Sequence, residues 1–125
     1  MSEEANTSLS KGEQDGLRRW LDRAEVLSST VQQLRKDLAL AEADLPEPGS
    51  GEGAFEDLRA GVLARLLELE RGSGNALQTA MYRVDIPERH LQRTLESGGL
   101  HALAGECVLR ALQKVLTRLR FAGRF

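Results

Sequence analysis

The side chains of this sequence best suited to metal binding or nucleophilic chemistry are His90, His101 and Cys107. Neither histidine has a Glu three residues before it or a His four residues away, the spacings found in helical di-metal and zinc-protease sites. Cys107 has no second cysteine to form a zinc motif, and it lies between Leu103 and Ala111 on a predicted apolar helix face. We therefore expect Cys107 to be a buried structural residue, and we predict a non-enzymatic protein with no catalytic residue, metal or cofactor.

The composition favours helices over strands. Hydrophobic residues make up 41% of the 125 residues and charged residues 29%, which are close to the averages of globular proteins. Leu, Ala, Arg and Glu have high helix propensity and are common, whereas β-branched residues are few and never clustered. We predict an all-α protein of about five helices, with a long N-terminal heptad-patterned helix and a compact C-terminal helical domain.

The N-terminal part of the chain changes from an irregular to a periodic pattern. Residues 1–14 are polar and without periodicity, which predicts a disordered tail. Apolar residues then recur at alternating intervals of three and four, at Leu17, Trp20, Ala24, Leu27, Val31, Leu34, Leu38, Ala41 and Leu45. This spacing predicts one helix over residues 15–45 that packs an apolar seam against another helix.

The next segment, residues 46–54, contains two prolines and three glycines and is predicted to be a flexible linker. Its letters Gly49-x-Gly51-x-x-Ala54 match a dinucleotide-binding fingerprint. That fingerprint requires a preceding strand, and here a predicted helix and two prolines precede it. We therefore predict no nucleotide site in the linker.

Residues 55–121 are predicted to form the helical domain, and residues 122–125 a C-terminal tail. Apolar periodicity and glycine-containing stops place helices at about 55–71, 76–84, 85–96 and 100–121. Asp85 and Glu88 have the spacing of a capping box, so we expect Asp85 to begin the third of these helices.

The lengths of the first two helices suggest an interaction. At 1.5 Å per residue the first helix is about 45 Å long and the second about 25 Å, so the second cannot cover the seam of the first. Soluble proteins seldom leave such a stripe exposed. We predict a protein-protein interaction or assembly module that self-associates or binds a protein partner through the seam. The residues expected to carry this contact are Leu17, Trp20, Leu27, Val31 and Leu34.

Residues 77–95 support an alternative function. The part Ile86-Pro87-Glu88-Arg89-His90-Leu91-Gln92-Arg93 is similar to the start of the recognition helix in the arabinose-regulator family. The resemblance covers about a sixth of the chain and implies a small helix–turn–helix DNA-binding regulator, dimerised by the N-terminal helix. It implies that Arg89, Gln92 and Arg93 face the major groove, and Arg110, Lys114 and Arg118 could then meet phosphates.

The sequence departs from that family at two positions. Met81 stands where a small residue is expected, and Asp85 stands where glycine is common. The other interpretation of residues 77–95 is that two helices simply meet at an Asp-capped corner inside a bundle.

Charge is distributed unevenly along the chain. Residues 1–70 carry 15 acidic and 8 basic side chains, whereas residues 71–125 carry 4 acidic and 9 basic ones. The basic C-terminal part could face an anionic partner, or its arginines could simply favour the negative end of the last helix dipole. The overall pI of about 5.7 argues against an isolated DNA-binding domain.

With one cysteine, no expected signal peptide and no apolar run of membrane length, we predict a cytoplasmic protein without membrane contact.

Overall fold

A computed structural model describes residues 10–123, and all regular structure in these residues is helical. The elements are α2 (Lys11–Arg19), the 3-10 helix η1 (Trp20–Asp22), α3 (Ala24–Leu38), α4 (Ala54–Arg71), α5 (Ala76–Val84) and α6 (Glu88–Phe121). The all-α prediction is confirmed, with five α-helices in the described part of the chain. No helix within it is long and apolar enough to cross a bilayer.

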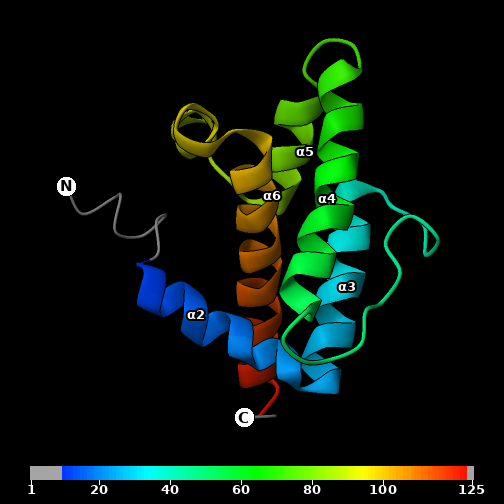
Figure 1. Cartoon of the computed structure of the whole chain (residues 1–125), viewed down its shortest axis with the longest axis vertical. Coiled ribbons are helices and arrows are strands. Elements are labelled where there is room, and N and C mark those ends of the chain that lie inside the picture. The colour runs from blue at the N-terminus through cyan, green and yellow to red at the C-terminus, as the bar shows by residue number, and fades with distance from the viewer. Residues whose placement is uncertain (1–9, 124–125) are drawn as a thin grey trace.

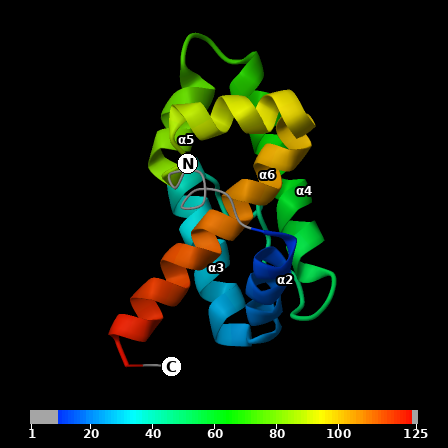
Figure 2. The ribbon, with the colours of Figure 1, turned by 90° about the vertical axis from the view of Figure 1, so that its left-hand side faces the viewer.

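The helices form a bundle around the second part of α6. This part runs beside α3 and α4, while α5 and the first part of α6 lie at one end of the bundle (Figures 1 and 2). α6 packs against α2, α3, α4 and α5, so the longest helix is also the central one. The second part of α6 has a broad buried face that accounts for this position, formed by Leu103, Ala104, Cys107, Val108, Ala111, Leu112 and Val115.

The predicted single N-terminal helix over residues 15–45 is wrong, because the chain bends twice within it. Arg23 is extended, with φ −91° and ψ 122°, and it separates η1 from α3. Ala39 then ends α3 in a left-handed conformation with φ 55°. The chain folds back after this residue, and Arg35 Nε donates to the carbonyl oxygen of Leu45 at 3.0 Å. The larger seam residues on both sides of the second bend are still buried in one core, among them Leu34, Leu38 and Leu45, whereas Ala24 and Ala41 are exposed.

The helix before this bend begins earlier than predicted. Ser10 and Glu13 form a capping box: Glu13 N donates to Ser10 Oγ at 3.1 Å and Ser10 N donates to Glu13 Oε1 at 2.9 Å. The predicted tail over residues 1–14 is therefore helical from Lys11 on, and residues 1–9 lie outside the described residues. Residues 46–53 contain no helix, and Ala54, the last residue of the predicted linker, begins α4. In the predicted C-terminal tail only 122–123 are described, and they form a turn.

The two predicted C-terminal helices are joined into one kinked element. At the kink Gly99 has φ 68° and ψ −161°, a conformation that is essentially confined to glycine. The first of the two helices begins after Pro87, and Asp85 does not cap it. Instead, Asp85 adopts the left-handed conformation with φ 73° at the end of α5, and its N–H donates to Tyr82 O at 3.1 Å.

Replacement of Gly99 by alanine is expected to lower the free energy of unfolding by about 2 kcal/mol, because alanine is strained in this conformation. A Cβ at Gly99 would meet no atom within 4 Å, so the loss comes from the backbone and not from a clash. Chemical denaturation measures it. The matched control is Gly16→Ala in the exposed part of α2, where helix propensity predicts a small gain. An unchanged stability of Gly99→Ala would show that the kink is not maintained in solution.

Within residues 10–123 the buried side chains form one hydrophobic core and not two. Leu27 and Leu34 of α3 belong to the same cluster as Leu58 of α4, Met81 of α5 and Leu112 of α6. The predicted N-terminal helix and C-terminal domain therefore share their interior.

Cys107 lies within this core, as predicted. It is fully buried, and its Sγ donates a weak hydrogen bond to Met81 Sδ at 3.6 Å. Burial raises the pKa of the Cys107 thiol well above its usual range, so the thiolate form is disfavoured. A buried neutral thiol of this kind is inert and contributes packing.

Candidate binding pocket

The seam residues predicted for protein association do not form a free surface. Leu27, Val31 and Leu34 are at most 1% exposed and pack inside the chain's own core. Leu17 and Trp20 are half-buried and lie against the edge of that core. α3 is short enough for α4, α5 and α6 to cover its apolar face together. The prediction of an uncovered seam, which assumed one N-terminal helix longer than the second helix, therefore no longer applies.

The residues predicted to face a DNA groove lie on the first part of α6. Arg89 and Gln92 are exposed there, and Arg93 is half-buried. The acidic residues Glu88 and Glu96 are exposed on the same segment. This segment therefore presents both charges to solvent, whereas a DNA-reading surface is dominated by positive charge.

The residues predicted to meet phosphates have partners inside the fold. Arg118 Nη1 donates to Gln33 Oε1 at 3.0 Å, which joins α6 to α3. Arg110 Nη1 donates to Gln113 Oε1 at 3.2 Å within α6. The third residue, Lys114, is 17% exposed and sits in an ion-pair network. The structure does not group these three residues into an open basic stripe.

The Lys114 network connects three helices. Lys114 Nζ contacts Asp37 Oδ2 of α3 at 2.9 Å, the carbonyl oxygen of Arg83 at 3.0 Å and Asp85 Oδ2 at 3.5 Å. Gln33 Nε2 also donates to both carboxylate oxygens of Asp37 at 3.1 Å. The charge of the buried Asp37 carboxylate is thereby compensated by the Lys114 ammonium group, and its oxygens accept hydrogen bonds, as a buried carboxylate requires.

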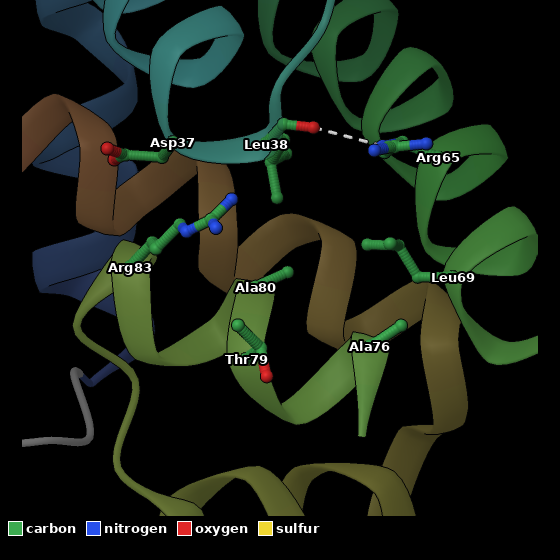
Figure 3. Close-up of a pocket in the computed structure, with 8 residues that line it drawn as sticks. All are labelled: Asp37, Leu38, Arg65, Leu69, Ala76, Thr79, Ala80 and Arg83. Carbon is green, nitrogen blue, oxygen red and sulfur yellow. Dashed lines mark hydrogen bonds between the residues drawn. The ribbon is translucent and has the colours of Figure 1, made fainter. Parts of the chain in front are cut away.

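An open pocket lies beside this network, where α3, α4 and α5 meet (Figure 3). Its volume is about 250 Å³. The residues that line it are Asp37, Leu38, Arg65, Leu69, Ala76, Thr79, Ala80 and Arg83. The four α5 residues recur at intervals of three and four, which puts them on one side of that helix.

The pocket has apolar walls and two guanidinium groups at its rim. Leu38 and Leu69 extend into it from α3 and α4 (Figure 3). Arg65 is already engaged, since its Nε donates to the carbonyl oxygen of Leu38 at 2.9 Å and its Nη1 pairs with Glu68 Oε1 at 3.2 Å. Arg83 points into the pocket from α5 and forms no side-chain ion pair among the described residues. The Arg83 guanidinium is therefore the uncompensated charge of this pocket.

A second open pocket, of about 340 Å³, has a more balanced charge. Its lining comprises Arg18, Arg19, Asp22, Gly51, Glu52, Phe55 and Glu56. The Arg18 guanidinium stacks on the Phe55 ring with 4.0 Å to the ring centroid. The hydrogen bond from Arg59 lowers the pKa of the Glu56 carboxyl. The three carboxylates of this lining offset its two arginines. The second pocket therefore has a weaker preference for a ligand of one charge than the first pocket has.

Sequence reasoning did not identify the first pocket. Asp37, Arg65 and Arg83 lie far apart along the chain, on three different helices, and no short motif relates them. The small residues of α5 give no specific signal for a pocket, because one of them, Ala80, is itself buried in the core.

Searches of protein-family models, curated proteins and solved structures each find no match to this chain. A function is therefore inferred from the helical fold and its surface.

Proposed function

We propose that this chain is a non-enzymatic helical binding module, and that a protein partner docks on the outer face of α5 beside the pocket. The observation that carries the proposal is the exposure of Tyr82, which is 82% accessible to solvent. Tyr82 precedes Arg83 in sequence and lies one helical turn from Thr79 of the pocket lining. Tyrosine and arginine are the residue types enriched among interface residues that dominate binding energy.

As in the prediction from sequence, the proposed ligand is a protein partner, but the contact surface is the outer face of α5 and not the seam. Leu27, Val31 and Leu34 could reach a partner only if the core opened. The α5 face needs no such rearrangement, since Tyr82 and Arg83 are exposed in the folded chain. An interface that uses an exposed surface avoids the free-energy cost of unfolding part of the module.

We also propose that the module acts in the cytoplasm. Its one cysteine is a buried free thiol and cannot form an internal disulfide, which suits a reducing compartment. Cell fractionation with an antibody against the native chain tests this location.

Replacement of Tyr82 by alanine is expected to weaken capture of the protein partner from a lysate by about 30-fold or more, the loss typical of a dominant interface residue. The fold should be retained, because Tyr82 lies outside the core, and circular dichroism checks this. Quantitative affinity capture followed by mass spectrometry measures the loss for each captured protein.

The matched control is Phe121→Ala, which removes another highly exposed aromatic residue at the end of α6. Its capture should equal that of the wild type. The proposal is contradicted if no protein is captured, or if capture depends on Phe121 and not on Tyr82. A captured second copy of this chain that depends on Tyr82 would identify the partner as the chain itself.

A small DNA-binding regulator is the second candidate function, and the turn between α5 and α6 favours it. Asp85 adopts a left-handed conformation where helix–turn–helix proteins commonly use glycine, and Ile86 is buried beyond it. Arg89 and Gln92 are then exposed on the following helical segment. Binding to duplex DNA that weakens steeply with salt and depends on Arg89 would support this function over the first.

A further inference from the structure

The pocket between α3, α4 and α5 has the chemistry of a site for an acidic side chain. We propose that it binds the carboxylate of a glutamate or aspartate from the protein partner, with the apolar walls contacting the neighbouring aliphatic atoms. This inference rests on the proposed function, because it specifies what the partner inserts next to Tyr82.

The charges around the pocket select a single anion. Lys114 and Gln33 hold the Asp37 carboxylate, and in Figure 3 that carboxylate points away from Arg83. Arg65 is committed to Leu38 O and Glu68, as described above. The Arg83 guanidinium is left to attract one negative charge, and its planar fork matches the two oxygens of a carboxylate.

The size and walls of the pocket favour a side chain over a larger ligand. Its volume of about 250 Å³ lies below the roughly 300–1,000 Å³ of pockets that hold drug-sized molecules. Leu69 and Ala76 are half-buried and supply apolar surface for methylene groups next to the carboxylate, whereas Leu38 and Ala80 of the lining are buried. A nucleic-acid strand fits less well, because its successive phosphates need several uncommitted cations and the lining offers one.

The test uses the full-length chain and two immobilised libraries of short peptides. Both libraries have the same randomised flanking residues, with Glu at the central position of one and Gln at that of the other. The wild type is expected to bind the Glu library about tenfold more strongly or better, which is the preference that a charge-assisted hydrogen bond provides.

Replacement variants connect this preference to the pocket. Arg83→Gln should abolish the preference for the Glu library. Arg83→Lys should keep only part of this preference, because lysine retains the positive charge but lacks the planar pair of N–H donors. The matched control, Arg71→Gln, changes an exposed arginine at the end of α4 outside the pocket lining and should preserve the preference. Thermal melting of each variant shows that the fold is retained.

Three outcomes overturn the carboxylate site: equal binding of both libraries, no binding of either, or a preference that survives in Arg83→Gln. If both libraries bind equally and Tyr82→Ala removes this binding, the docking face stands and only the carboxylate site fails. If binding depends on neither Tyr82 nor Arg83, the proposed function fails as well. Binding of a duplex oligonucleotide that disappears in Arg83→Gln would assign the site to nucleic acid and contradict a protein partner.

Discussion

A double variant with Leu27→Asp and Leu34→Asp is expected to be unfolded along the whole chain, including residues 55–125. Both leucines are at most 1% exposed and belong to the core shared by α3, α4, α5 and α6. Truncation of a buried leucine to alanine costs about 2–5 kcal/mol, and a buried carboxylate without a partner adds further cost. Two such changes together exceed the stability of about 5–15 kcal/mol that is usual for a domain. Far-ultraviolet circular dichroism and amide NMR dispersion measure the result.

The control variant carries Ala24→Asp and Gln32→Asp, which place the same two charges at exposed positions of α3. It should remain folded. Persistent native amide signals from residues 55–125 in the Leu27 and Leu34 variant would contradict the shared core. They would also restore the interpretation that the N-terminal helices form a separate element that is available for association.

Replacement of Lys114 by methionine is expected to lower the free energy of unfolding by about 3 kcal/mol, with a fall in Tm of roughly 10–15 °C. The reason lies mainly in Asp37, whose side chain is 9% exposed and whose ion-pair partner in the described structure is Lys114. Without Lys114 the fold must keep a buried, unpaired carboxylate, which is more costly than the loss of the ion pair itself. Differential scanning calorimetry measures both quantities.

A second variant separates the cost of the unpaired charge from the cost of lost packing. Lys114→Met combined with Asp37→Leu removes both charges and should recover most of the lost stability, since an apolar pair can replace a buried ion pair. If Lys114→Met alone leaves Tm unchanged, the network does not join α3 to α6 in solution. If the double variant is less stable than the single one, packing and not charge accounts for the loss.

The fold class and the features that depend on neighbouring residues could be predicted from the amino-acid sequence. The predicted helices at 55–71 and 76–84 match α4 and α5 almost residue for residue, because apolar periodicity and the glycines between them act locally. Burial of Cys107 followed from its position on the apolar stripe of one helix. The absence of helix from residues 46–53 could be expected from proline and glycine, whose backbone preferences need no tertiary partner.

The surface that each apolar or charged stripe faces depends on the packing of the whole chain and could not be predicted from local sequence. The seam from Leu17 to Leu45 predicts one continuous helix. Its spacings of three and four do not distinguish a continuous helix from shorter helices that bend and pack against the same core. The bends at Arg23 and Ala39 place α3, with its buried Leu27 and Leu34, against α6, and this arrangement depends on residues far away in the sequence. Likewise, the sequence predicts Lys114 to be part of a solvent-facing basic stripe. In the folded chain its Nζ lies 2.9 Å from Asp37 Oδ2. Periodicity specifies that a face must be covered, but the covering element is selected by packing and charge across the whole chain.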